Sequence, residues 1–212
     1  MKKPKASDFV FLDTETVAEK ETYFEDKVFD DLIEIGIVDI EGNVLLQSLV
    51  KPLPKYHSTE WNGTKYHGLT IADLQDAPTL MDISEQVSEI ISNRYVVAHN
   101  SQFDLSVLRQ SWKANGLKME DFPSSRWIDT KSEYEKAFLS HIENPKELRS
   151  ASSLKTLCTR YGFYAKDLHH RASHDAEMLR KLFMEMYTLD MPYPWEWTQS
   201  VTKHNRVITV NP

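Results

Sequence analysis

The segment "DFVFLDTETV" (Asp8 to Val17) decides how the rest of the chain is interpreted, because an apolar run ends there in two carboxylates. The run "FVFL" is typical of a buried strand. Side chains two positions apart in a strand point to the same face, so Asp13 and Glu15 lie side by side at its end. Burying charge is unfavourable unless something compensates it. The pair could share a metal ion, although taken alone it also fits a solvated or capping pair.

Length and composition predict one folded domain. The 212 residues, 41% of them hydrophobic, suffice for one core, which we expect to span residues 1–190, with residues 191–212 as a C-terminal extension. No apolar run has the length of a bilayer-spanning helix, and the start lacks the pattern of a secretory signal. We therefore expect a cytoplasmic protein without a membrane contact. The single cysteine, Cys158, has no internal partner and fits a buried thiol.

The charge is acidic overall but unevenly distributed. A net charge of −7 argues weakly against a protein that wraps duplex nucleic acid. From Asp13 to Glu34 there are nine acids and two bases, whereas from Lys146 to Lys181 there are eight bases and four acids. An acidic end that faces a basic flank would suit a site for cations and an anionic substrate together. Solvated surface segments explain the same pattern equally well.

Outward from the first strand, the pattern predicts an α/β domain. Four further strands are expected within 32–40, 42–52, 94–100 and 126–132, and the first two of these are joined by a turn at Glu41-Gly42-Asn43. Helices are expected to start at Thr70 and Thr79 and to cover 101–115, 152–162 and 173–189. The acidic segment 17–31 is interpreted as a loop with a helical piece. A mixed five-stranded sheet with helices on both faces follows.

Two later segments place more acids at strand ends, where ligands of such sheets gather. In "VVAHNSQFDLSVL" a strand ends and Asp104 falls in the first turn of a helix, although a Ser101 to Asp104 cap would explain that acid too. In "HHRASHDAEML" Asp175 opens the last helix, and His170 precedes it by five positions. A histidine just outside a helix start can reach the same cavity as a carboxylate in its first turn.

Together, "FLDTET", "AHNSQFDLSVL" and "HHRASHDA" resemble, in this order, the three motifs of the DEDDh 3′→5′ exonucleases. This family includes the epsilon subunit of DNA polymerase III, ribonuclease T and oligoribonuclease. Supporting matches are "LIEIGIVDI", "YHGLT", "IDT" and "SLKTLCTRYGF", so that the resemblance extends from Asp8 to about Tyr187. It implies a ribonuclease H-like fold. Val17-Ala18 stands where many relatives have Thr-Gly, and this departure points to an unusual rim on that side of the site.

The resemblance implies a role for each matched residue. Asp13 would bridge two divalent cations, Mg²⁺ or Mn²⁺, while Glu15 and Asp175 would complete the tighter site and Asp104 would help to hold the second ion. Four carboxylates and two such cations balance in charge, and the loaded site could accept a phosphodiester. His170 would take the proton from the attacking water, as a group with a pKa near 6.5 can do. His169 and His174 compete for this role, but the motif spacing favours His170.

Further residues are expected to contact the substrate or to support the site. Candidates for contact with the terminal nucleotide are Thr14, Thr16, His67, Asn100 and Phe103, with Trp61 and Tyr66 as possible stacking partners. A core position for Phe103, and supporting structural positions for His67 and His99, are the competing interpretations.

The leading hypothesis is therefore a two-metal exonuclease that releases mononucleotides from single-stranded or frayed 3′ ends of DNA, in proofreading or repair. The alternatives are an exoribonuclease of the ribonuclease T or oligoribonuclease kind and a non-catalytic scaffold that binds nucleic acid or a polymerase. The first motif, nearer to "DTET" than to the oligoribonuclease "DLEMTG", favours DNA. A polymerase contact is a possible partnership, and the sequence does not fix an oligomeric state.

Overall fold

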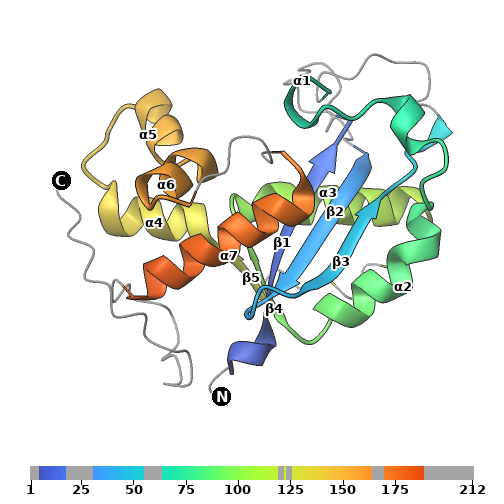
Figure 1. Ribbon diagram of the computed structural model, residues 1–212, viewed down its shortest axis with the longest axis horizontal. Coiled ribbons are helices and arrows are strands. Elements are labelled where there is room, and N and C mark those ends of the chain that lie inside the picture. The colour runs from blue at the N-terminus through green and yellow to red at the C-terminus, as the bar shows by residue number, and fades with distance from the viewer. Residues whose placement is uncertain are drawn as a thin grey trace.

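A computed structural model describes residues 5–17, 31–54, 64–118, 122, 126–163 and 170–188 (Figure 1). Its centre is a five-stranded sheet in the order β3-β2-β1-β4-β5. The strands are β1 (Phe9–Thr16), β2 (Leu32–Asp39), β3 (Val44–Leu49), β4 (Tyr95–Ala98) and β5 (Trp127–Asp129). β1 pairs antiparallel with β2 and parallel with β4, and β4 pairs parallel with β5. The expected mixed α/β sheet is confirmed.

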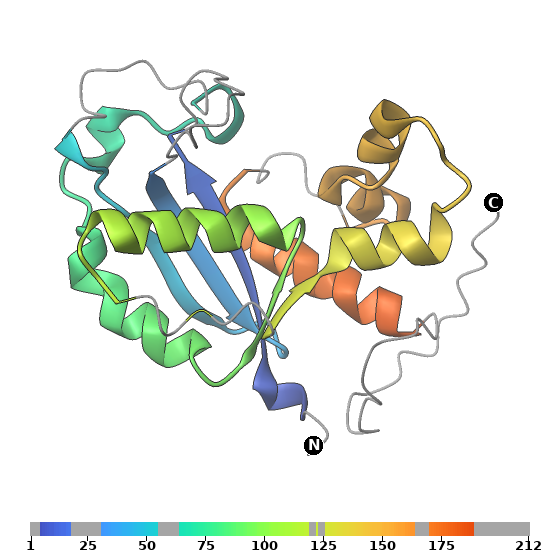
Figure 2. The same cartoon turned by 180° about the vertical axis from the view of Figure 1, so that it is seen from behind.

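Seven α-helices lie in the described ranges: α1 (Thr64–His67), α2 (Leu80–Ile91), α3 (Ser101–Ala114), α4 (Thr130–Phe138), α5 (Pro145–Ala151), α6 (Leu154–Arg160) and α7 (Ala172–Thr188). Helices α2 and α3 cover one face of the sheet, and α7 covers the other (Figures 1 and 2). Helices α4, α5 and α6 pack together with α7 beyond β5. None of the helices within the described ranges is both long and apolar enough to cross a membrane.

The two cores follow from the alternation along β1. Val10 and Leu12 pack toward α2 and α3, whereas Phe9 and Phe11 pack toward α7, where Phe11 lies edge-on to Phe183 with ring centroids 5.3 Å apart. These β1 side chains are fully buried. The alternation continues beyond Leu12, and it therefore directs Asp13 and Glu15 to the α7 face and Thr14 to the α3 face.

Several predicted elements are confirmed with revised bounds. The hairpin turn lies where expected, with the Gly42 amide donating to the Asp39 carbonyl. Asp73 and Asp82 accept hydrogen bonds from Thr70 and Thr79 as predicted, but the first of these starts leads only to a single 3-10 turn, Ile71–Leu74. The expected apolar stripe of the last helix, from Met178 to Met186, is buried. Cys158 is a buried free thiol, and burial raises its pKa to about 12.

One expected strand is shorter than predicted, and one segment without a predicted element is helical. The strand predicted within 126–132 ends at Asp129, because the Asp129 side chain accepts from the Lys131 amide and starts α4 there. The segment 134–152, which carried no predicted element, contains most of α4 and all of α5. Residues 18–30, Trp61, His169 and 191–212 lie outside the described residues. The loop interpretation of the acidic segment and the assignment of a C-terminal extension stay predictions.

Candidate active site

The first motif places two carboxylates on one face of the sheet at the end of β1. Asp13 and Glu15 are half-buried, in contrast to the fully buried apolar residues before them. Across the antiparallel pairing, Asp13 lies opposite Gly36 and Glu15 lies opposite Glu34. The face they share is the one against which α7 packs. The end of β1 therefore presents both acids toward the start of α7.

The second motif brings a third carboxylate to the same strand end. Helix α3 begins after Asn100, which has a left-handed backbone with φ of 75°, and Asp104 follows in its first turn. Asp104 is 3% exposed, and one of its carboxylate oxygens accepts a hydrogen bond from the Thr14 hydroxyl at 2.8 Å. The alternative of a Ser101 to Asp104 cap is not what the structure shows, since Asn100 precedes the helix. The hydroxyl of Thr14 thereby holds Asp104, and the expected substrate contact of Thr14 stays a prediction.

The third motif adds a carboxylate and the histidine. Asp175 lies in the first turn of α7 and is 5% exposed. Its Oδ2 accepts from the His170 amide at 3.2 Å and lies 4.0 Å from His170 Nδ1. His170 has φ of 61°, so the chain turns sharply just before the helix. Ligand atoms of Glu15, His170 and Asp175 lie within 4.8 Å of one another. Residues far apart in the chain thus meet in one cluster.

The electrostatics of the cluster are unfavourable without a cation. Burial raises the pKa of Asp13 well above its usual range, and the charges of Asp104, Asp175 and Glu15 raise it further. Burial likewise raises the pKa of Glu15 to about 8, and the pKa of both Asp104 and Asp175 to about 7. These carboxylates resist ionisation near neutral pH because burial and mutual repulsion both disfavour their charged forms.

This donor set fits hard divalent cations. Mg²⁺ and Mn²⁺ prefer carboxylate oxygens, and a cation among raised-pKa acids removes the repulsion that opposes their ionisation. Asp13, Glu15, Asp104 and Asp175 would hold the ions. Burial lowers the pKa of His170, and the charges of His67 and Lys155 lower it further, which favours the neutral form of the imidazole.

A fifth carboxylate, Glu34, was not among the predicted site residues. It is 1% exposed, lies on β2 opposite Glu15, and raises the pKa of Asp13, Glu15 and Asp175. The signal was present in "LIEIGIVDI", where an acid interrupts an apolar strand as Asp13 and Glu15 do in the first motif. The structure shows its compensation, which is the guanidinium of Arg171 at 2.9 Å.

His67, expected to contact substrate or to support the site, is a buried structural residue in the described region. Its Nε2 lies 3.1 Å from the Thr16 carbonyl, and its Nδ1 accepts from the Leu69 amide at 3.0 Å. Because a carbonyl only accepts, the ring is neutral with the proton on Nε2, and burial lowers its pKa accordingly. The contact uses the backbone of Thr16, whose side chain is buried. His67 thereby joins α1 to the end of β1.

This attachment places an exposed aromatic ring beside His170. Tyr66, next to His67 in α1, is 59% exposed and lies edge-on to the His170 ring with centroids 6.0 Å apart. Phe103, next to Asp104, is 41% exposed, so the competing expectation of a core position is wrong. Both rings have the free surface that stacking on a base requires.

The end of β4 has a structural role as well. His99 Nε2 donates to the Ser152 carbonyl at 2.8 Å, its Nδ1 lies 3.0 Å from the Thr130 hydroxyl, and burial lowers its pKa to about 4. This supports the structural interpretation of His99. The Asn100 amide donates to Asp129 at 2.8 Å, while the residue as a whole is exposed. Asn100 therefore remains accessible for the predicted contact.

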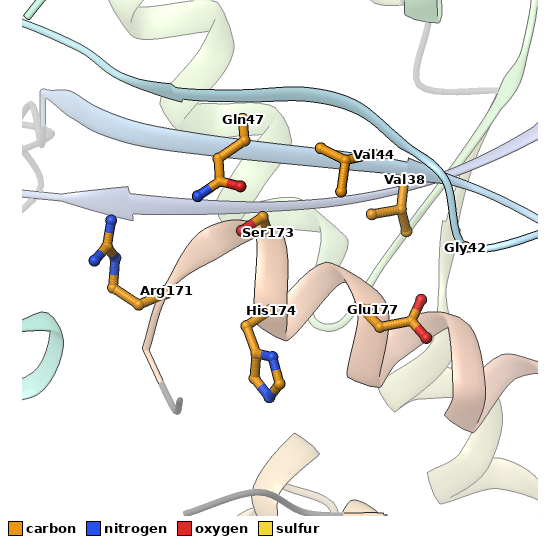
Figure 3. Close-up of a pocket in the computed structure, with 8 residues that line it drawn as sticks. All are labelled: Val38, Gly42, Val44, Gln47, Arg171, Ser173, His174 and Glu177. Carbon is orange, nitrogen blue, oxygen red and sulfur yellow. The ribbon is translucent and has the colours of Figure 1, made fainter. Parts of the chain in front are cut away.

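A cavity of about 380 Å³ lies on the face of the sheet that α7 covers (Figure 3). Its lining comes from the β2-β3 hairpin and from the first turns of α7 with the residue before them: Val38, Gly42, Val44, Gln47, Arg171, Ser173, His174 and Glu177. None of the four clustered carboxylates of β1, α3 and α7 belongs to it. His174 points away from the sheet in this view, whereas Arg171 reaches toward it. His174 therefore lines this cavity, whereas the ring of His170 lies near Glu15 and Asp175.

The fold and the cluster define a class of protein, an α/β domain with converging acids at the carboxyl end of its first strand. Comparison with known proteins gives the family. The exonuclease family model RNase_T matches residues 10–183, and the chain belongs to this family.

Curated relatives of the chain include DNA polymerase III proteins. The chain is 28% identical over 188 residues to the PolC-type DNA polymerase III of Mycoplasmopsis pulmonis (strain UAB CTIP), a match that covers 86% of this chain and 12% of that protein. It is also 28% identical over 188 residues to the DNA polymerase III subunit epsilon of Buchnera aphidicola subsp. Schizaphis graminum (strain Sg), covering 84% of this chain and 73% of the subunit. The chain therefore spans only a small part of the PolC-type relatives.

Solved structures share the fold. The nuclease domain of 3′hExo, a DEDDh family member bound to rAMP, has a TM-score of 0.63 and 14% identity, with 89% of this chain and 94% of that chain covered. The Pop2p protein of S. pombe, in a form with Mg²⁺ and Mn²⁺ bound, has a TM-score of 0.57 and 15% identity, with 86% and 83% covered. These similarities confirm the expected ribonuclease H-like fold.

Proposed function

We propose that this chain is a divalent-metal-dependent 3′→5′ exonuclease that releases nucleoside monophosphates from single-stranded or frayed 3′ ends of DNA. The observation that carries the proposal is the meeting of Glu15, Asp175 and His170 within 4.8 Å, with Asp13 and Asp104 adjoining in the same electrostatic cluster. Family membership supports the same reaction class. All four acids and the histidine of the motif set are present, which disfavours a non-catalytic scaffold.

The residues divide the work of hydrolysis. Divalent cations held by Asp13, Glu15, Asp104 and Asp175 would supply the positive charge that orients the scissile phosphate and makes water a better nucleophile. The water oxygen forms a bond to phosphorus while the bond from phosphorus to the 3′ oxygen of the preceding nucleotide breaks. His170 accepts the proton of the water, and the leaving oxygen takes a proton from solvent. Tyr66 and Phe103 offer stacking surfaces to the terminal bases.

DNA is the proposed substrate because the relatives at 28% identity are DNA polymerase III proteins. By the same reasoning we propose that the chain acts with a DNA polymerase on mispaired primer ends. An exonuclease that needs a free end removes a frayed, mismatched terminus faster than a paired one, since pairing must be broken before the end reaches the acids.

Digestion of labelled oligonucleotides tests the proposal. A 5′-labelled single-stranded DNA should shorten stepwise, and a 3′-labelled one should release labelled mononucleotide at once, only with Mg²⁺ or Mn²⁺ present. RNA of the same sequence and duplexes with paired or mispaired 3′ ends run in parallel. Internal cleavage, or activity that persists in EDTA, would contradict the proposal. Faster digestion of RNA than of DNA would show that RNA is the substrate.

A further inference from the structure

Glu34 and Arg171 form an ion pair that the proposed chemistry does not use. Arg171 Nη2 lies 2.9 Å from Glu34 Oε1, and Arg171 Nε lies 3.1 Å and 3.2 Å from the two carboxylate oxygens. The Ala172 amide donates to Oε2 at 3.3 Å. The acid is 1% exposed, whereas the arginine side chain is 42% exposed. The buried carboxylate thus accepts from three N–H groups, and the Nε–H of Arg171 is shared between its two oxygens.

This arrangement argues against Glu34 as a further metal ligand. The residue faces the same side of the sheet as Glu15, directly across the strand pairing. Its oxygens, however, are directed into the fork of Arg171 and the first amide of α7, and a fork of this kind is the geometry that guanidinium and carboxylate prefer. Binding a cation would require breaking these charge-assisted bonds.

A second contact two residues along β2 fixes the same segment. A Cβ built on Gly36 would lie 2.2 Å from the Ser173 nitrogen and 2.3 Å from the Ala172 carbonyl carbon. The backbone at the start of α7 therefore touches β2 itself. Residues 171–173 are held at two points, by charge at Glu34 and by close approach at Gly36. His170 immediately precedes this anchored segment, and its amide donates to Asp175.

We infer that the Glu34–Arg171 pair positions His170, by fixing the backbone from which the imidazole projects toward the cluster. The inference rests on the proposed function and deepens it by naming two positioning residues. Two other roles are distinguishable. Arg171 could attract the substrate phosphate through its exposed guanidinium, or Glu34 could bind metal. The first predicts an effect on substrate affinity, and the second an effect on metal affinity.

The decisive experiment compares Arg171→Gln in the wild-type and His170→Ala backgrounds. Misplacing a catalytic group by about 1 Å can lower a rate by roughly 10²-fold, so we expect Arg171→Gln to lower kcat by roughly 10–100-fold with KM changed less than about two-fold. In the His170→Ala background the same change should lower kcat by less than about two-fold, because the group that it positions is absent. A full additional loss there would overturn the inference.

Arg171→Lys separates positioning from attraction of phosphate. Lysine keeps the charge but lacks the planar fork, so a positioning role predicts that it restores little of kcat, whereas a phosphate contact predicts substantial recovery of KM and rate. Recovery would overturn the inference. Arg171→Gln leaves a buried acid without its partner. If that variant fails to fold, Arg171→Lys replaces it in the kinetic comparison.

Arg180→Gln is the matched control. Arg180 also forms a two-pronged pair on α7, with Glu177 at 2.6 Å and 2.8 Å, and its pair lies farther along the helix from His170. We expect kcat to be unchanged in this variant even if the melting temperature falls. An equal loss of kcat in both arginine variants would show that general loosening of α7, and not positioning of His170, explains the effect.

Two readouts do not depend on turnover. Calorimetric titration with Mn²⁺ should give affinities for Arg171→Gln and Glu34→Gln within about three-fold of wild type, and loss of binding in Glu34→Gln would overturn the inference in favour of a metal ligand. In histidine-edited ¹H–¹⁵N spectra without metal, the His170 ring signal should shift or broaden in Arg171→Gln, while that of His99 stays in place. An unmoved His170 signal would overturn the inference, whether or not the wild-type protein digests oligonucleotides. Absence of digestion by the wild-type protein would refute the proposed function and leave this readout intact.

Discussion

At the scale of single residues, Asp13 is the group on which the repulsion of the site converges. Burial and the charges of Asp104, Asp175, Glu15 and Glu34 all raise its pKa. In the metal-free protein its ionised form is therefore unfavourable, yet the same ionised form is what a bound cation needs. Function and stability make opposite demands on this side chain.

Asp13→Asn should separate these demands. The amide keeps the shape and removes the charge, so oligonucleotide digestion should fall by at least about 10³-fold, the scale of losing one group of a catalytic set. In EDTA the variant should melt at a higher temperature than wild type, since one source of repulsion is gone. Circular-dichroism melts and the digestion assay measure both. A variant that is inactive but also less stable without metal would show that the acid is compensated in another way.

His170 carries a prediction that also resolves the competition between histidines. Replacing it by alanine should lower kcat by roughly 10²–10⁴-fold, the usual contribution of a general base, without loss of Mn²⁺ affinity greater than a few-fold. His174→Ala is the comparison, because His174 lines the cavity beside α7. We expect near wild-type turnover there. If the two variants exchange these outcomes, the proton acceptor is misassigned.

The residue scale also shows what the motifs could and could not reveal. The motif spacing anticipated that Asp13, Glu15, Asp175 and His170 would lie together, because strand alternation and helix starts place them at one sheet edge. The use of Glu34 was not predictable in this way, since its partner Arg171 lies 137 positions away in the chain. Local patterns identify a buried acid but not the distant cation that neutralises it.

At the scale of elements, the packing of α7 on β2 decides the geometry of the site. The helix can approach the strand because position 36 has no side chain, and the strand register places Gly36 opposite Asp13. The start of α7 thereby reaches the end of β1 closely enough for Asp175 and Glu15 to share a cluster. A small residue in β2 thus controls the position of acids on two other elements.

Gly36→Ala should therefore damage both stability and activity. The added Cβ would overlap the backbone of Ser173, and forcing such an atom into a packed core usually destabilises by about 1–3 kcal/mol. Displacement of α7 should lower the rate of digestion further than the loss of folded protein explains. Denaturant titration and assays well below the unfolding midpoint test this.

Gly162→Ala, in the turn after α6, provides the contrast to Gly36→Ala. Its Cβ would meet nothing within 4 Å, although its φ of 79° disfavours alanine. It should cost about 1 kcal/mol through backbone strain while leaving kcat unchanged. If Gly36→Ala behaves in the same way, the close approach of α7 and β2 does not control the site.

Elements differed in how well their sequence revealed them. Strands β1, β2 and β4 are apolar runs and were predictable, as was α7 from its buried stripe. Helices α4 and α5 were missed because their pattern is weak, with only Thr130 and Tyr134 buried in the first and no residue in the second. Their start signals were present, since Asn144 accepts from the amides of Lys146 and Glu147 and Pro145 opens α5.

At the scale of the whole molecule, the ionisable groups make stability depend on pH in opposite senses. Acids with pKa near 7 to 8 in the folded protein, namely Glu15, Asp104 and Asp175, bind protons that the unfolded chain has released above about pH 4. These acids therefore make the folded state less stable as pH rises from about 4 to about 8. His99, with a pKa of about 4 in the folded protein, has the opposite effect. It makes the folded state less stable as pH falls below about 6.5, because the unfolded chain then binds a proton that the folded protein does not.

The effect of His99 opposes that of the acids only below about pH 6.5. Between about pH 6.5 and 8 the acids therefore determine how stability changes with pH. In EDTA the melting temperature should therefore fall steadily across this interval, and the free energy of unfolding from denaturant titrations should fall with it. Mg²⁺ or Mn²⁺ should remove most of the decline, since cations favour the ionised carboxylates, so the stabilisation by metal should be larger at pH 8 than at pH 6.5.

Potassium chloride at equal ionic strength controls for screening, and Asp13→Asn should show a flatter decline. A metal-free melting temperature that rises across the interval would mean that the acids are already compensated within the folded chain, and repulsion among them could then not be the reason that the cluster needs cations.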